Sequence, residues 1–355
     1  MEKYNSNGIY FSRNSECFGY LNSYLEKNAK AKVFVLVDQN TKQYCLPVLI
    51  KNLIRKVNIV QIPSGEKYKN LETCQILWQE LIDQGADRYS ILINLGGGVI
   101  TDMGGFIAAT YKRGIRFVNI PTSLLAMVDA AIGGKTGVDF NHLKNQIGIF
   151  VTPVMTLIYP EFLKTLVPRE FNSGFAEVIK YGLINSQNIW EYLQKRETNA
   201  NKIDASIIEQ SVEIKEKIVA QDSKEKGIRK SLNFGHTLGH AIETCFLSKT
   251  TSEQLLHGEA IAAGMILAAS ISSQTIDFPI EKTREITALI SKLYKKVVFT
   301  SSDINTILDL LQHDKKNLNG QLNFVLLKAI GLPKLDCKVS EKAIRKAFAF
   351  YESFA

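Results

Sequence analysis

The sequence predicts an α/β protein in two parts, a parallel sheet with crossover helices followed by a mostly α-helical part. In the first half, short apolar runs alternate with amphipathic stretches, which is the pattern of βαβ units. From about Pro160 onward, helical periodicity replaces this alternation. A chain of 355 residues is long enough for two hydrophobic cores. We therefore expect one domain over residues 1–165 and a second over residues 166–355.

The expected strands of the first part are short and apolar, and they cover residues 33–37, 57–62, 90–95 and 116–120. Continuous apolar runs such as VFVLV are typical of strands that are buried on both faces. Between them, stretches such as LETCQILWQELIDQG, from Leu71, carry apolar residues at helical spacing. The first part is therefore predicted to be a nucleotide-binding α/β domain.

The second part is expected to be helical. Helical periodicity is found over residues 173–184, 203–222, 232–247, 255–273 and 280–294. One small hairpin is predicted from LNFVLLKAIG and LDCKVS. Pro160 and Pro168 mark the junction between the two parts, and we expect a ligand cleft between the halves of the chain.

Composition excludes several classes of protein. The net charge is +8, but basic and acidic residues are interspersed, so an anionic small molecule is expected as partner and no nucleic acid. Five scattered cysteines indicate neither a disulfide framework nor a CxxC metal site, so we expect a reducing compartment. The N-terminus has no hydrophobic signal core, and the apolar run from Ala260 is too short to span a bilayer. We expect a cytoplasmic protein with no membrane partner.

Three consecutive glycines, Gly96, Gly97 and Gly98, follow the expected strand SILINL. Glycines between a strand and a helix let the backbone approach a pyrophosphate, which the helix N-terminus attracts. The spacing differs from the dinucleotide fingerprint GxGxxG, because Thr101 stands where the last glycine belongs. A tight turn without a ligand explains such a triplet about as often. Asp38 at the end of VFVLVD and the polar loop PSGEKYKN favour the cofactor reading.

A polar, glycine-rich stretch, PTSLLAMVDAAIGGKTGVDFNHLKNQIG, contains Asp129, Lys135, Lys144 and Asn145. It holds too many glycines for a plain core helix. Two lysines beside glycine turns form a good anion cradle, and a solvated loop is the alternative.

Three of the five histidines lie in one stretch, at His236, His240 and His257. His236 and His240 are four residues apart and share one face of the expected helix, so spacing alone makes them a metal-binding pair. Glu177 offers a carboxylate, and histidines with a carboxylate are a usual ligand set of catalytic zinc. The alternative is that these are hydrogen-bonded core histidines. The preceding segment adds polar residues, namely Lys215, Glu225, Arg229 and Asn233.

Six motifs together resemble the 3-dehydroquinate synthase family, in the family's order and over nearly the whole chain. They are GGGVITDMGGFIAATYKRG, PTSLLAMVDAAIGGKTGVDF, KNQIG, GFAEVIKYG, LNFGHTLGHAIE and HGEAIAAGM. The resemblance implies a Rossmann-like NAD-binding domain followed by a helical metal-binding domain, usually as a homodimer. It implies conversion of a phosphorylated sugar acid, 3-deoxy-D-arabino-heptulosonate 7-phosphate, to 3-dehydroquinate and phosphate. The alternatives are another sugar-phosphate cyclase or a related metal-dependent polyol dehydrogenase.

The resemblance also implies site residues, with NAD and one divalent metal, Zn or Co, as cofactors. The metal ligands are expected to be Glu177, His236 and His257, which leaves His240 near the substrate phosphate. The substrate and catalytic residues implied are Arg113 (across a dimer interface), Asp129, Lys135, Asn145, Lys180, Lys215, Arg229, Asn233, His240 and a lysine of HDKK, assigned to Lys315 with Lys316 as the alternative. The cofactor contacts implied are Asp38, Ser64, Gly65, Glu66, Lys67, Tyr68, Lys69, Gly98, Val99, Ile100, Thr101, Asp102, Thr122, Ser123, Lys135, Lys144, Phe162, Leu163, Lys164 and Thr165. One departure is Ser173, where some relatives carry Asn.

Overall fold

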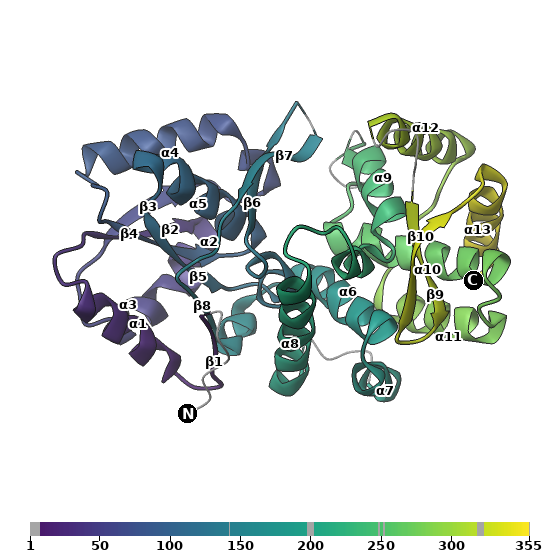
Figure 1. Ribbon diagram of the computed structural model, residues 1–355, viewed down its shortest axis with the longest axis horizontal. Helices are drawn as coiled ribbons and strands as arrows, with labels where there is room; N and C mark the ends of the chain where they lie inside the picture. The colour runs from purple at the N-terminus through teal and green to yellow at the C-terminus, as the bar shows by residue number, and fades with distance from the viewer. Residues whose placement is uncertain are drawn as a thin grey trace. The chain divides into compact units, whose positions relative to one another are not determined.

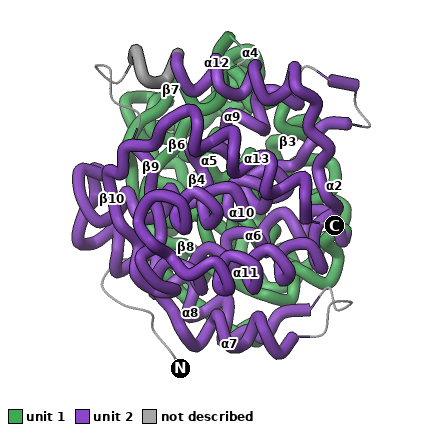
Figure 2. Tube along the Cα trace, turned by 90° about the vertical axis from the view of Figure 1, so that its right-hand side faces the viewer, with its two compact units in different colours: residues 1–167 green, residues 168–355 purple. Residues whose placement is uncertain are grey.

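The structure is a computed structural model that describes residues 8–141, 143–196, 202–247, 249–250, 253–317 and 323–354, with the backbone alone over 313–317. The chain forms two compact units, residues 1–167 and 168–355 (Figure 2). This division lies two residues beyond the expected boundary of 165. Among the described residues, every helix is too short or too polar to cross a membrane.

The first unit contains the parallel sheet expected from the sequence (Figure 1). Its strands lie in the order β1-β8-β5-β4-β2-β3. They are β1 (Ile9–Phe11), β2 (Val33–Asp38), β3 (Asn58–Ile62), β4 (Ile91–Gly96), β5 (Arg116–Pro121) and β8 (Met155–Ile158). The four expected strands are confirmed. The sequence did not indicate β1 and β8, which have only three and four residues and so carry little periodicity.

Helices cover both faces of this sheet. They are α1 (Cys17–Lys27), α2 (Gln39–Tyr44), α3 (Leu46–Asn52), α4 (Leu71–Asp83) and α5 (Gly98–Thr110), with short 3-10 turns η1 (Glu66–Tyr68), η2 (Tyr111–Arg113) and η4 (Pro160–Thr165). Buried residues of α4 and α5 pack against apolar side chains of β2, β3 and β4 in one core. Figure 1 shows α1 and α3 on the other side of the sheet. Because both faces are covered, β4 is buried along its whole length.

The strand order contains a switch point between β2 and β4. From β2 the chain crosses to β3 on one side, and from β3 it returns to β4 on the other. In open parallel sheets, ligands bind outside the carboxyl ends of the strands at such a point. Asp38 ends β2 and the glycine triplet ends β4, so the topology brings both to the expected place.

The polar, glycine-rich stretch is folded, so the alternative of a solvated loop was wrong. Residues Ala126–Ala130 form a π-helix, η3, and the strands β6 (Lys135–Phe140) and β7 (Leu143–Phe150) form an antiparallel hairpin. The two strands approach closely at Gly137 and Gly148. A Cβ added at Gly148 would lie 2.3 Å from the backbone oxygen of Thr136, so the glycines serve strand pairing.

The second unit is helical, apart from one hairpin. Its elements are α6 (Pro168–Ile184), α7 (Gln187–Lys195), α8 (Ala205–Gln221), the 3-10 turn η5 (Ile228–Asn233), α9 (His236–Leu247), α10 (His257–Thr275), α11 (Ile280–Leu293), α12 (Ser301–Asn317), β9 (Asn323–Ala329), β10 (Leu332–Lys338) and α13 (Glu341–Ser353). The helical character and the hairpin agree with the sequence. Helix α10 is packed by α6, α9, α11, α13 and β9, which explains why its sequence is apolar on nearly all sides.

Glycines set the spacing of the helices around α10. A Cβ at Gly258 would lie 1.9 Å from the backbone oxygen of Ser173 in α6, and one at Gly264 would lie 2.2 Å from that of Gly235. The helix expected from residue 232 begins instead at His236. The reason is the left-handed backbone of Gly235, with φ +77°, which separates η5 from α9.

Candidate active site

The glycine triplet forms the junction of β4 and α5. Gly97 is the N-cap of α5, and Gly98 is its first residue. A Cβ at Gly96 would lie 2.4 Å from the side chain of Ile100, so the turn itself requires a glycine there. The first backbone N–H groups of a helix have no partner within it, and they attract anions. The hydroxyl of Thr101 donates back to the helix backbone at Gly97 and Gly98 rather than outward.

A small cluster lies at the carboxyl end of β2, and it consists of Asp38, Cys45, Thr122 and Thr165. The Asp38 carboxylate accepts from the backbone N–H of Thr41 at 2.7 Å and so caps α2. Burial and the charge of Asp38 raise the pKa of the Cys45 thiol to about 12, while hydrogen bonds with Thr122 and Thr165 oppose this. The structure therefore brings Asp38, Thr122 and Thr165, which are far apart in sequence, around one thiol.

A buried lysine joins three predicted segments of the first unit. Lys69 Nζ lies 2.7 Å from Asp102 Oδ2 and 2.6 Å from Asn145 Oδ1. Burial lowers the pKa of Lys69, but the carboxylates of Asp102 and Glu66 outweigh burial and raise it. Asn145 has a left-handed backbone, with φ +53°, and its N–H donates to Asp139 Oδ1 at 2.8 Å. Lys69 thus links the loop after β3, the first helical turns of α5 and the β6–β7 hairpin.

The other expected residues described here lie around η1, in the β6–β7 hairpin, or in the short helical segments η2, η3 and η4. Ser64 contacts Gln39, and Lys144 Nζ lies 3.3 Å from Glu66 Oε1. Gly65 to Tyr68 form or flank η1, and Phe162 to Thr165 lie in η4, where Phe162 is buried. The expected substrate residues here are Arg113 in η2, which is exposed, Asp129 in η3 and Lys135 at the start of β6.

Four side chains converge in the second unit from three helices. Glu177 Oε1 in α6 lies 3.3 Å from His236 Nε2 in α9 and 3.5 Å from His257 Nε2 at the start of α10. One ring nitrogen each of His236, His240 and His257 lies within 4.8 Å of the others. Spacing alone paired His236 with His240, but the structure adds His257 and Glu177 to this group. Glu177 and His236 are buried, whereas His240 is exposed.

The donor atoms fit a divalent cation. Both oxygens of Glu177 are buried, and apart from the ion pair with Lys180 neither has a hydrogen-bond partner among the described residues. The Nδ1 of His236 lies 3.1 Å from the carbonyl oxygen of Phe234, which leaves Nε2 as the lone-pair atom facing Glu177. Histidine nitrogens and a carboxylate oxygen that face one point without hydrogen-bonding one another are the arrangement of an ion site.

Electrostatics keep Glu177 ionised. Burial opposes its charged form, but the ammonium of Lys180, with which it forms an ion pair, and His236 hold the pKa of this carboxyl well below its usual range. Burial and Lys180 lower the pKa of His236. Burial also lowers the pKa of His257, but its contacts with Glu177 and Glu243 outweigh burial and raise it to about 9.

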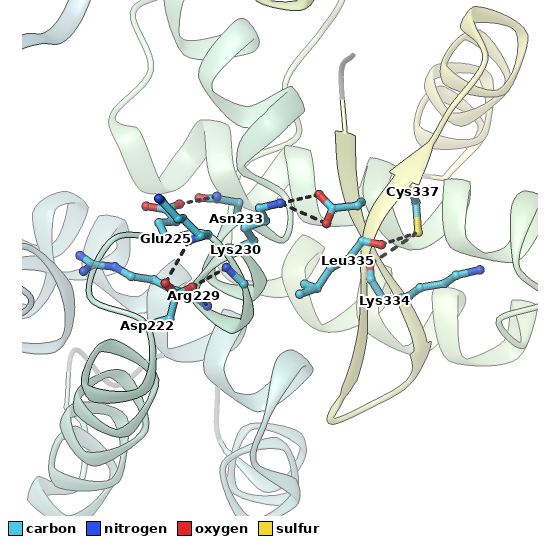
Figure 3. A network of polar contacts seen from close by, with 11 residues as sticks. Asp222, Glu225, Arg229, Lys230, Asn233, Lys334, Leu335 and Cys337 are labelled. Atoms are coloured by element: carbon cyan, nitrogen blue, oxygen red, sulfur yellow. Dashed lines mark hydrogen bonds and ion pairs between the residues drawn. The ribbon is translucent and has the colours of Figure 1, made fainter. Parts of the chain in front are cut away.

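The polar segment before α9 forms a network (Figure 3). Asp222 accepts from the backbone N–H groups of Gly227 at 2.7 Å and Arg229 at 3.1 Å. Asn233 donates to Glu225 Oε1 at 2.7 Å. The side chain of Arg229 is buried, so this segment is more than a solvated run of charged residues. Lys215 in α8 is buried as well.

Some residues stand outside these groups. Lys315 and Lys316 lie in α12, but their side chains fall outside the described residues.

The sequence alone did not indicate Asp222 or Glu243. Asp222 had no distinguishing signal. Glu243 had one, because it follows His236 by seven residues and so lies on the same helix face, two turns on.

Comparisons with known proteins show which family the chain resembles. The family model described as 3-dehydroquinate synthase N-terminal matches residues 59–173, and the one described as 3-dehydroquinate synthase C-terminal matches residues 174–317. A 3-dehydroquinate synthase of Parabacteroides distasonis is 42% identical over 339 residues, covering 94% of this chain and 95% of the relative.

Solved structures share the fold. A 2-deoxy-scyllo-inosose synthase, complexed with carbaglucose-6-phosphate, NAD+ and Co2+, has a TM-score of 0.82 and 26% identity, covering 96% of this chain and 95% of that chain. A 2-epi-5-epi-valiolone synthase from Streptomyces hygroscopicus, with NAD+ and Zn2+ bound, has a TM-score of 0.83 at 23% identity, covering 100% and 99%. The matches to the two family models cover most of the chain, and the chain belongs to the 3-dehydroquinate synthase family.

Proposed function

We propose that this protein is an NAD- and metal-dependent 3-dehydroquinate synthase. It converts 3-deoxy-D-arabino-heptulosonate 7-phosphate to 3-dehydroquinate and phosphate, a step of the shikimate pathway. The observation that carries the proposal is the convergence of Glu177, His236 and His257 from α6, α9 and α10 in a chain of this family. A cysteine-free ligand set of this kind accepts Zn or Co.

The two cofactors have separate places in this proposal. NAD is held at the carboxyl ends of β2 and β4, by the N-terminus of α5, Asp38 and the loop that ends at Lys69. The divalent ion is held by Glu177, His236 and His257. When bound, NAD exchanges a hydride with a ring carbon of the substrate, and the metal polarises the oxygen on that carbon. The overall conversion involves no net oxidation, so NAD would be needed only in catalytic amount.

The chain's own residues bind and orient the substrate. In the first unit, Lys135 and Asn145 are proposed to bind phosphate oxygens, and Lys69 holds the Asn145 amide in place through Oδ1. In the second unit, His240 is proposed to donate to the leaving phosphate, and Lys180, Lys215, Arg229 and Asn233 to bind the anionic and hydroxyl groups. Donors fixed before the reaction stabilise developing charge at low reorganisation cost. Holding both ends of the opened sugar together favours the final ring closure.

The test is phosphate release from 3-deoxy-D-arabino-heptulosonate 7-phosphate by metal-loaded protein, with a catalytic amount of NAD, while the NADH absorbance is followed. We expect release that requires NAD, that stops when a chelator removes the metal, and that leaves no net NADH. Absence of release with this substrate contradicts the proposal.

The assay also separates the alternatives. The 26% identity to a 2-deoxy-scyllo-inosose synthase over nearly the whole chain makes another sugar-phosphate cyclase the second candidate. Release of phosphate from glucose 6-phosphate, with none from the sugar acid, would favour that candidate. Net accumulation of NADH on a simple polyol would instead identify a dehydrogenase.

We further propose that the enzyme is a cytoplasmic homodimer, with Arg113 of one protomer reaching the site of its partner. Arg113 is exposed and lies in a left-handed turn, with φ +68°, which supports its reaching a partner protomer. All five cysteine thiols are free and buried, which supports a reducing compartment such as the cytoplasm. Light scattering on the purified protein measures the mass directly. Restoration of activity on mixing Arg113→Ala with Glu177→Gln protomers would support a site shared between protomers.

A further inference from the structure

One buried carboxylate beside the proposed metal site has no role in the reaction described above. Glu243 in α9 is 3% exposed, and its Oε2 lies 3.3 Å from Nδ1 of His257. The other ring nitrogen of His257, Nε2, lies 3.5 Å from Glu177 Oε1. The imidazole therefore stands between two carboxylates, one on the side of the proposed ion and one behind the ring.

Different groups contact the Nδ1 atoms of the two proposed histidine ligands. His236 has a neutral backbone carbonyl, that of Phe234, 3.1 Å behind its ring. His257 has a charged side chain in the same position. A carboxylate that accepts from Nδ1–H fixes the tautomer in which Nε2 carries the lone pair, and it makes that nitrogen a stronger donor to a metal.

The packing of α9 and α10 holds this contact in place. A Cβ at Gly264 in α10 would lie 2.8 Å from the backbone nitrogen of Gly239 in α9. A Cβ at Gly239 would lie 2.6 Å from the side chain of Ile261. The glycines let the two helices approach closely enough for a carboxylate of α9 to reach a ring at the start of α10. His236 and Glu243 lie on one face of α9, so this helix brings a ligand and the carboxylate together.

We propose that Glu243 is a positioning residue for metal binding, which orients the imidazole of His257 and strengthens its Nε2 as a ligand. The inference deepens the proposed function, because it rests on the metal site of Glu177, His236 and His257. Its readout is the affinity for zinc and does not depend on turnover.

The experiment measures zinc affinity of the full chain by competition with a chromophoric chelator at fixed pH, and the absorption spectrum of the cobalt-loaded protein. Glu243→Ala removes both the acceptor and the charge, and we expect the zinc affinity to fall about 100-fold. Glu243→Gln keeps the size and one acceptor oxygen but loses the charge, so we expect a fall of about 10-fold. The cobalt spectrum of both variants should shift.

Glu259→Gln is the matched control. Glu259 lies at the same end of α10, accepts from the backbone N–H of Leu256 at 2.8 Å, and pairs with Arg169 at 2.8 Å. A disturbance of the helix end alone would weaken zinc binding in this variant too. We expect its zinc affinity to stay within about two-fold of wild type, since the imidazole contact is intact.

The outcomes are distinct. If Glu243→Ala does not fold, the near-isosteric Glu243→Gln carries the test. Wild-type affinity in Glu243→Gln, or an equal loss in Glu259→Gln, would overturn the inference. A wild-type protein that binds no zinc overturns it together with the proposed metal site. A wild-type protein that binds zinc but does not turn over the sugar acid contradicts only the proposed reaction.

Discussion

The glycine junction of β4 and α5 differs from the histidine cluster of the second unit in the origin of its binding groups. The first presents backbone N–H groups from consecutive residues, Gly97 and Gly98 onward. The second presents side chains from α6, α9 and α10, which only helix packing brings together. A backbone site is therefore sensitive to any added side chain that blocks access, whereas a side-chain site depends on each ligand and on the helix contacts beneath it.

The largest effect is expected from Glu177→Gln, which removes the carboxylate on which the cluster converges. We expect metal binding to be lost and turnover to fall at least about 1,000-fold, because a neutral amide is a weak ligand and Lys180 remains buried without its ion-pair partner. Metal content and the phosphate-release rate are the measurements.

The loss of the ion pair will also lower stability, so a second variant is needed. In Glu177→Gln/Lys180→Met no buried charge is left unpaired, and the melting temperature should recover toward wild type while metal binding stays absent. Metal bound at wild-type affinity by either variant would contradict the ligand assignment.

Gly258→Ala tests the helix contacts beneath the cluster. The added Cβ would lie 1.9 Å from the backbone oxygen of Ser173, so α6 and α10 must move apart. We expect a loss of stability of about 3 kcal/mol or more, together with weaker zinc binding. Urea unfolding and chelator competition measure the two effects. Unchanged values for both would show that this close contact does not set the ligand geometry.

Gly98→Ala tests the backbone site. Its Cβ would lie 3.4 Å from Ala130 Cβ, an ordinary contact, so the fold should be retained. If NAD binds at this junction as proposed, the methyl group hinders the close approach of its pyrophosphate to the backbone, and we expect NAD affinity to fall about 10-fold, or about 1.4 kcal/mol. Zinc affinity should not change. Calorimetric titration with NAD is the measurement, and a wild-type value would argue against a cofactor at this junction.

The smallest effect is expected at Asp303, which belongs to neither site. Burial raises the pKa of its carboxyl, but hydrogen bonds from Lys249 and Thr300 outweigh burial and lower it. A lowered folded-state pKa contributes stability above the unfolded-state pKa of about 3.9, and this contribution is lost as the pH falls further. Asp303→Asn should cost about 1 kcal/mol at neutral pH, because Asp303 also bonds the backbone N–H of Thr300 at the start of α12.

The measurement is thermal unfolding of Asp303→Asn and wild type at a series of pH values. We expect the two melting temperatures to converge as the pH falls below about 4. A difference that is constant down to acid pH would show that the charge of Asp303 contributes nothing.

Much of the fold was predictable, because periodicity records which face of each element is buried. Strands β2, β3, β4 and β5 and the helical second half were predicted on that basis. The β6–β7 hairpin was missed, since the glycines that allow its strands to approach, Gly137 and Gly148, also read as loop signals. β1 and β8 were too short to show a pattern.

The sequence by itself determined the strand and helix periodicity, the glycine turn and the family motifs, because these depend on residues that are neighbours along the chain. Tertiary structure decided the rest. Lys69 meets Asp102 and Asn145, which are 33 and 76 residues away, and Glu177 faces histidines of two other helices. Such contacts depend on helix packing and sheet topology, and spacing along one helix, which had favoured His236 with His240, carries no record of them.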